Sequence, residues 1–202
     1  MLDFFDITQV LVSFGYLALF LIVFAETGLL IGFFLPGDTL LFTAGLLAAQ
    51  GVLGLPETIL VCFVAAVIGD SFGYYLGHKF GKRVFEKKGH FLSDYLNKEN
   101  LEKTREFYAK YGDWTIFLAR FVPVVRTIAP TMAGTGDMPY PTFISYNVFG
   151  GLAWVLVATL AGFFLGALFP NAVQVLSALM LLIIAASIAP LAWKMLGRKM
   201  KK

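Results

Sequence analysis

Two arginines and four acidic residues stand in otherwise apolar stretches of this sequence. They are Glu26, Asp38, Asp70, Arg120, Arg126 and Asp137. If these stretches lie in a membrane, each ionised side chain costs about 2.5 to 3.5 kcal/mol at the bilayer centre on insertion scales. These side chains must therefore contact one another, water or a ligand.

Arg120 and Arg126 are the residues best suited to bind an anion. A guanidinium is planar, and its paired N–H donors match the oxygens of a phosphate. Glu26 and Asp38 lie in another broken apolar segment, so two facing segments would be balanced in charge. We expect the two carboxylates to pair with the arginines in an empty site and to exchange protons. The alternative is that all four groups form ion pairs that only hold the segments together.

Asp70 and Asp137 are secondary candidates. Asp70 lies among small residues, where a close-packed helix face with a polar side chain is at least as good an explanation as a site. Asp137 is expected to cap a helix that begins near Thr142. No spacing typical of a metal site, a cofactor motif or a catalytic nucleophile is visible. The sequence therefore predicts no enzyme, no metal and no cofactor.

The composition is that of an integral membrane protein. Of the 202 residues, 58% are hydrophobic and 14% charged, and the mean hydropathy is +0.77. Such a chain has too little polar surface to cover a soluble globule. The net charge of +3 comes with basic clusters at the ends of apolar segments. This pattern favours contact with membrane headgroups over binding to nucleic acid.

The apolar segments predict an all-α membrane protein. Three of them are long enough to span a bilayer, at 55–77, 140–169 and 172–193. The segments at about 8–50 and 114–138 are interrupted by proline, glycine and charged residues. We expect each of these to form a re-entrant helical hairpin, with its broken backbone buried in protein or facing a wet cavity. The alternative is that each segment forms a true pair of spans, which would give the same sidedness.

The basic residues predict the topology. They gather in a connector at 79–112 and in the tail at 194–202, and both are therefore expected on the cytoplasmic side. Within the connector, 97–111 has the pattern of an amphipathic helix on the membrane surface. The N-terminus carries acidic residues and no basic ones, so we expect it outside, and we expect no cleaved signal peptide.

Short matches suggest an internal repeat. Pro36 follows Glu26 at the same interval as Pro130 follows Arg120, and "GYYLG" at 73–77 resembles "GFFLG" at 162–166. A hairpin and one span in each unit, at 1–78 and 113–169, would invert the second unit relative to the first. Transporters with this pattern bind substrate at the repeat interface.

Two longer motifs resemble the DedA family of bacterial membrane proteins, of the VTT or SNARE-associated superfamily. They are "FAETGLLIGFFLPGD" at 24–38 and "FLARFVPVVRTIAPTMAG" at 117–134, and the resemblance covers roughly residues 8–170. Glu26 and Asp38 match the acidic positions of the family, and Arg120 and Arg126 match its arginines. The resemblance implies opposed hairpins, lipid movement across the membrane and activities that depend on the proton motive force. Bacterial members are associated with undecaprenyl phosphate or phosphatidylethanolamine.

The sequence thus predicts a translocase for a phosphate-bearing lipid in the bacterial cytoplasmic membrane. In this hypothesis Arg120 and Arg126 bind the phosphate, while Glu26 and Asp38 serve as charge partners that can couple transport to protons. A proton-coupled exporter of small cations or drugs, and a membrane-organising protein without transport, remain alternatives. The sequence also leaves a homo-oligomer open.

Overall fold

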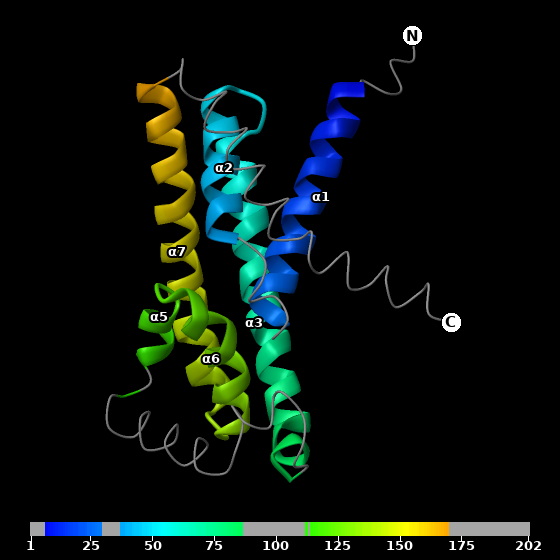
Figure 1. The fold of residues 1–202 in the computed structure, drawn as a ribbon, viewed down its shortest axis with the longest axis vertical. Helices are drawn as coiled ribbons and strands as arrows, with labels where there is room; N and C mark the ends of the chain where they lie inside the picture. Colours follow the sequence, from blue (N-terminus) through cyan, green and yellow to red (C-terminus); the bar gives the residue numbers. More distant parts are fainter. Residues whose placement is uncertain (1–6, 30–36, 87–111, 113, 170–202) are drawn as a thin grey trace, which may run out of the picture. The chain divides into compact units, whose positions relative to one another are not determined.

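The computed structural model describes residues 7–29, 37–86, 112 and 114–169. All regular structure in these residues is helical (Figure 1). The helices are α1 (Ile7–Gly28), α2 (Gly37–Ala49), α3 (Leu55–Glu86), α5 (Thr115–Ala119), α6 (Pro123–Thr135) and α7 (Tyr140–Leu168). The predicted span at 172–193 and the predicted amphipathic helix at 97–111 lie outside the described residues.

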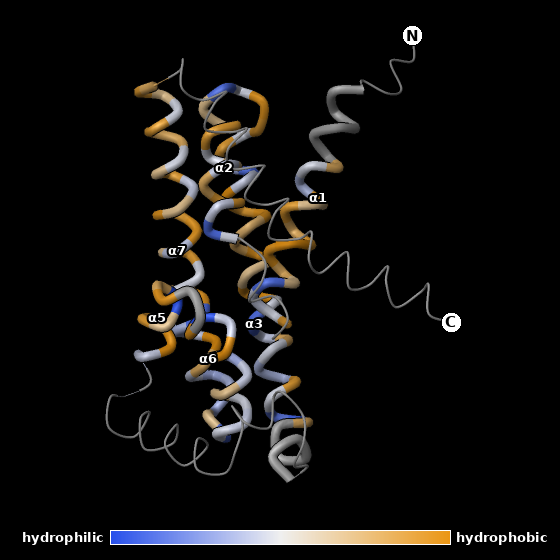
Figure 2. The backbone as a smooth tube through the Cα atoms, in the orientation of Figure 1, coloured by the Kyte–Doolittle hydropathy of each residue, from blue (hydrophilic) through white to orange (hydrophobic). Residues whose placement is uncertain are grey.

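Helices α3 and α7 are the two described helices that are long and apolar enough to cross a membrane. The apolar stretches are Leu55–Phe80 and Tyr140–Leu168, of 26 and 29 residues. Figure 2 shows apolar residues along the length of α7. Large apolar side chains are exposed on it, among them Phe149, Val157, Phe164 and Leu168. The structure therefore agrees with the spans predicted at 55–77 and 140–169, although α3 continues to Glu86.

Apart from α1, which has 22 residues, the helices of the two interrupted segments are short. Helix α2 has 13 residues, α5 has 5 and α6 has 13. At 1.5 Å per residue, a helix of that length reaches at most about 20 Å, which is less than the hydrocarbon core of a bilayer. Breaks in both segments were predicted. Their re-entrant path through a membrane stays a prediction.

The second interrupted segment breaks between Ala119 and Pro123. Helix α5 ends at Ala119, Val122 is extended with φ −112° and ψ 108°, and α6 begins at Pro123. Proline fits the first position of a helix, because its missing N–H has no partner there anyway. Pro130 lies inside α6 and does not end it. Pro36 lies outside the described residues, so its predicted match with Pro130 stays a prediction.

The chain forms two compact units. The arginine unit consists of residues 24–33 and 63–154, and the second unit of residues 1–23, 34–62 and 155–202. The arginine unit contains the end of α1, most of α3, all of α5 and α6, and the first half of α7. Its core is a cluster of buried side chains from α3, α5, α6, α7 and the loop before α7, namely Tyr74, Ile116, Ala119, Ala129, Ala133, Met138 and Phe143.

Glycines allow α6 to approach α3 closely in the arginine unit. A Cβ atom at Gly77 would overlap the carbonyl oxygen of Thr131, and one at Gly134 would overlap the carbonyl oxygen of Tyr74. The Tyr74 side chain extends this contact, since its hydroxyl donates a hydrogen bond to the carbonyl of Met138. Backbone meets backbone along this helix pair, and α6 is thereby fixed against the spanning helix.

The second unit has a similar helix pair. A Cβ atom at Gly45 of α2 would overlap the carbonyl oxygen of Thr159 in α7, and one at Gly162 would overlap that of Phe42. Each unit therefore packs a short helix from an interrupted segment against one of the two long apolar helices.

Candidate functional site

Arg120 lies where the chain turns from α5 into α6. It is the residue after Ala119, its backbone N–H bonds to the carbonyl of Phe117, and only 2% of its surface is exposed. The adjacent face of α7 carries Gly150 and Gly151. A Cβ atom at Gly150 would come within 3.2 Å of Arg120 Cγ, and one at Gly151 within 3.4 Å of Arg120 Nη2. The two glycines therefore leave room for the arginine beside α7.

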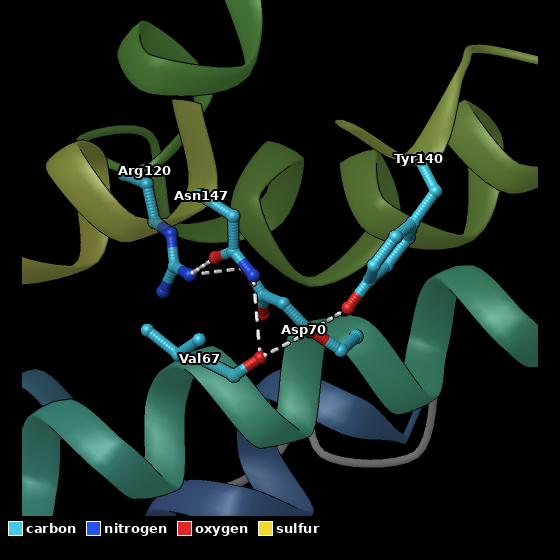
Figure 3. Close-up of polar contacts among 6 residues, drawn as sticks. Val67, Asp70, Arg120, Tyr140 and Asn147 are labelled. Carbon is cyan, nitrogen blue, oxygen red and sulfur yellow. Dashed lines mark hydrogen bonds and ion pairs between the residues drawn. The ribbon is translucent and has the colours of Figure 1, made fainter. Parts of the chain in front are cut away.

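The guanidinium of Arg120 contacts acceptors from two helices. Its Nη2 atom forms an ion pair with Asp70 Oδ2 of α3 and donates a hydrogen bond to Asn147 Oδ1 of α7. Figure 3 shows the side chains of Asp70 from α3, Asn147 from α7 and Arg120 from the turn after α5 converging. Asn147 also donates from Nδ2 to the carbonyl oxygen of Val67, at 3.2 Å. The arginine, the aspartate and the asparagine are all buried.

Some polar atoms of this ion pair have no hydrogen-bond partner in the described part of the chain. They are Arg120 Nε and Asp70 Oδ1, both inaccessible to solvent. A guanidinium has five N–H donors, and the contacts of Arg120 with described residues all use Nη2. The side chain therefore keeps hydrogen-bonding capacity that these protein contacts do not use.

Arg126 forms a second buried ion pair. Its Nη2 atom contacts Glu26 Oε1 in the last turn of α1, and the side chains are 6% and 1% exposed. Its guanidinium also lies over the ring of Trp154, with 4.8 Å between Cζ and the ring centroid. The flat face of the cation thus meets an aromatic ring while its edge meets a carboxylate, and this combination favours arginine over lysine.

The two ion pairs form one electrostatic cluster. Helices α1 and α3 meet at Gly28 and Gly69, where a Cβ atom on Gly28 would lie 2.7 Å from the Gly69 carbonyl oxygen. This close approach brings the end of α1, with Glu26, next to the turn of α3 that carries Asp70. The charge of Arg126 acts on Asp70, and that of Glu26 acts on Arg120. The four formal charges sum to zero.

The structure places the predicted site residues in three groups. Glu26 pairs with Arg126 in the arginine unit, and Arg120 lies in the same unit. Asp38 is exposed in the first turn of α2 and belongs to the second unit. Its predicted contact with the arginines therefore stays a prediction. Asp70, a secondary candidate in the sequence, is the direct partner of Arg120.

Asp137 lies outside the ion-pair cluster. It is exposed, has a φ of 60°, and its Oδ1 is 3.9 Å from Nδ1 of His78. Helix α7 begins at Tyr140, two residues before the predicted Thr142. Nothing in these contacts connects Asp137 with the arginines.

Sequence reasoning missed Asn147. The signal was a lone amide side chain in the apolar sequence of α7, in "SYNVFGGLAW". A buried amide in a spanning helix needs hydrogen-bond partners, because hydrocarbon supplies none. Among the described residues, no group of three His, Cys, Asp or Glu side chains is placed to hold a metal ion.

The chain is similar to one protein family and to several bacterial membrane proteins. Residues 35–164 match a family model described as the VTT domain. Protein DedA of Escherichia coli K12 is 45% identical over 177 residues, which are 87% of this chain and 79% of that protein. The inner membrane protein YqjA of the same strain is 37% identical over 153 residues, 75% of this chain and 67% of that protein. An uncharacterized membrane protein of Mycobacterium tuberculosis H37Rv is 45% identical over 148 residues, which are 72% of this chain and 63% of that protein. No solved structure matches.

Proposed function

This chain belongs to the DedA family of VTT-domain membrane proteins, and from that premise we propose that it moves a phosphate-bearing lipid across the bacterial cytoplasmic membrane. The substrate class includes undecaprenyl phosphate and phospholipids such as phosphatidylethanolamine. The relatives are named as membrane or inner membrane proteins of bacteria, which supports this location.

The observation that carries the proposal is the burial of two guanidiniums next to the break between α5 and α6. Buried arginines are costly unless they bind an anion, and their planar donors suit phosphate oxygens. In the proposed cycle Arg120 and Arg126 bind the headgroup phosphate while the hydrocarbon tail stays in the bilayer. The carboxylates of Asp70 and Glu26 occupy the arginines when no lipid is bound.

The charge balance of the cluster favours an anionic substrate over a cation. Glu26 and Asp70 already neutralise the two arginines, so these four groups have no surplus negative charge with which to bind a cationic drug. A phosphate can replace a carboxylate on an arginine if the displaced carboxylate takes up a proton, which keeps the buried site neutral.

Proton coupling and the inverted repeat are further parts of the proposal. Glu26 and Asp38 are the carboxylates we assign to proton exchange, with the N-terminus outside and the C-terminus in the cytoplasm. The glycine contacts support a repeat, because the same sequence interval separates Gly45 from Gly134 and Gly77 from Gly166. All four glycines lie at close helix contacts, so this register fits the packing of the described helices.

The proposal is tested in proteoliposomes. Purified protein is reconstituted with a trace of fluorescent phosphatidylethanolamine or polyprenyl phosphate, and a membrane-impermeant quencher reports how much label reaches the other leaflet. We expect faster exchange than in protein-free liposomes and loss of exchange in the Arg120→Ala, Arg126→Ala double variant. A labelled lipid alcohol without phosphate serves as the control. Exchange equal to that of empty liposomes for both phosphate lipids would contradict the proposal.

A further inference from the structure

Two acceptors of different charge share one nitrogen of Arg120. Nη2 contacts the acidic side chain of Asp70 on α3 and the neutral amide of Asn147 on α7. An anionic ligand would compete with these two acceptors in different ways. The ligand repels a carboxylate and competes with it for the positive charge of the guanidinium. An amide has no net charge, so the ligand does not repel it and can bind beside it.

We propose that Asp70 is an exchange carboxylate, which leaves Arg120 when a lipid phosphate binds and returns when the phosphate departs, and that Asn147 is the positioning residue that holds Arg120 throughout. This inference rests on the proposed function. It assigns separate roles to two residues that the family resemblance did not single out.

The contacts of Asp70 are suited to reversible displacement. One of its oxygens, Oδ2, meets Arg120, while Oδ1 has no hydrogen-bond partner among the described residues. Removing the carboxylate from the guanidinium therefore breaks one ion pair and no wider network within that part of the chain. Because Asp70 is only 2% exposed, the displaced side chain must take up a proton to avoid an uncompensated buried charge. Without substrate, the returning carboxylate prevents Arg120 from remaining as an uncompensated charge in a site that is almost fully buried.

The contacts of Asn147 are suited to a fixed role. Its side chain is completely buried, with Oδ1 accepting from Arg120 and Nδ2 donating to the carbonyl of Val67. This arrangement ties the guanidinium to both long helices. The Val67 carbonyl also accepts a hydrogen bond from Ser71 Oγ at 2.7 Å. Replacing Asn147 by alanine therefore leaves that carbonyl paired and removes mainly the hold on Arg120.

The two roles predict opposite effects of two uncharged replacements. In Asp70→Asn the competing anion is absent, so phosphate should bind about tenfold tighter, and it should be released and transported more slowly. In Asn147→Ala the guanidinium loses its hydrogen bond to the amide oxygen and is no longer held in position. Phosphate should therefore bind about tenfold more weakly. Residues with a merely structural role would lower stability and binding in the same direction.

The experiment uses the purified full-length chain in detergent, with farnesyl phosphate as the probe and farnesol as the phosphate-free control. Binding is measured by calorimetry, and stability is measured by thermal melting. Transport is measured with fluorescent polyprenyl phosphate in proteoliposomes. Thr159→Val is the matched control, because Thr159 is buried on α7 and its hydroxyl has no partner in the described residues. That control should bind the probe like the parent. If Asp70→Asn does not fold, Asp70→Ser carries the same expectation.

The outcomes separate this inference from the proposed function. If the parent binds farnesyl phosphate no better than farnesol, the proposed function fails and the exchange model fails with it. If the parent binds the phosphate but removal of the Asp70 charge weakens binding, Asp70 is no exchange carboxylate. If Asn147→Ala binds like the parent, Asn147 does not position Arg120. Opposite shifts in affinity, with turnover reduced in Asp70→Asn, would support both roles.

Discussion

Glu26 and Arg126 are separated by 100 residues in sequence and form a buried ion pair that joins the end of α1 to the first turns of α6. Each residue is unfavourable at its own helix end. Glu26 adds negative charge near the negative C-terminal end of the α1 dipole, and Arg126 adds positive charge near the positive N-terminal end of the α6 dipole. Each charge neutralises the other in the ion pair. Losing one partner leaves the other residue as an uncompensated buried charge at an unfavourable helix end.

Conservative replacement of the arginines should be poorly tolerated. Arg126→Lys keeps the charge but replaces a planar fork with a compact ammonium, which cannot cover the Trp154 ring and meet a carboxylate edge in the same way. Arg120→Lys keeps one nitrogen for Asp70 and Asn147 but loses the other N–H donors of the guanidinium, which we assign to the phosphate. We expect transport in proteoliposomes to fall about tenfold or more in each variant.

Expression and melting temperature provide the control for these two variants, since unfolded protein would also lose transport. Lys79→Arg is a matched exchange on the exposed end of α3, where Lys79 contacts Tyr75, and it should transport like the parent. If both arginine variants transported lipid at the parental rate, paired donation from guanidinium to phosphate would be wrong.

The contact between α3 and α6 should be sensitive to a single methyl group. In Gly77→Ala the added Cβ would overlap the backbone of Thr131, which cannot move away without shifting α6. Overpacking of this kind costs about 1 to 3 kcal/mol. Thermal melting in detergent should show a clear loss of stability. In the control, Gly73→Ala, the nearest atom to the new Cβ is 3.4 Å away, an ordinary contact. Equal melting temperatures for the two variants would contradict this account of the packing.

Much of the architecture could be predicted because length and hydropathy determine it. An uninterrupted apolar run such as Tyr140–Leu168 has few alternatives to a spanning helix. The location of a break was harder to predict. Pro130 reads as a helix breaker, yet it lies within α6, and the chain breaks instead between Ala119 and Pro123. Local propensity was overridden there by the close packing of α6 against α3.

The site could be predicted only in part, for a related reason. The cost of burying charge identified Glu26, Arg120 and Arg126. Which carboxylate meets which arginine depends on how helices pack, and the sequence does not show that the glycines of α1 and α3 bring Asp70 to the cluster. Asn147 was missed because an uncharged amide costs less to bury and so gives a weaker signal.

The two ends of the chain should be labelled from opposite sides of the membrane. The basic tail predicts a cytoplasmic C-terminus, and an odd number of crossings then places the N-terminus outside. The native Cys62 is fully buried, so cysteines introduced by Asp3→Cys and Lys202→Cys can be probed separately with an impermeant thiol reagent in intact cells. We expect labelling of the first and not of the second. Labelling of both or of neither would show that the predicted topology is wrong.

Proton coupling can be separated from simple charge balance by neutral replacements. If Glu26 or Asp38 carries the coupling proton, Glu26→Gln or Asp38→Asn should fold and still bind lipid phosphate, because the amide resembles the protonated acid in size. Transport should continue without its dependence on the proton gradient, because an amide releases no proton at physiological pH. A purely structural ion pair predicts a different result for Glu26→Gln. The buried Arg126 would lose its charged partner, and stability would fall first, by about 3 to 5 kcal/mol.

The decisive measurement is lipid transport with and without an imposed pH gradient, beside a melting curve for each variant. Asp38 is exposed in the first turn of α2, whereas Glu26 is 1% exposed and paired. The two variants therefore test an accessible and a buried carboxylate under the same conditions. Loss of gradient dependence in one variant, with its melting temperature unchanged, would identify the coupling residue. Unchanged gradient dependence in both would exclude these carboxylates as the coupling site and favour passive scrambling of the lipid.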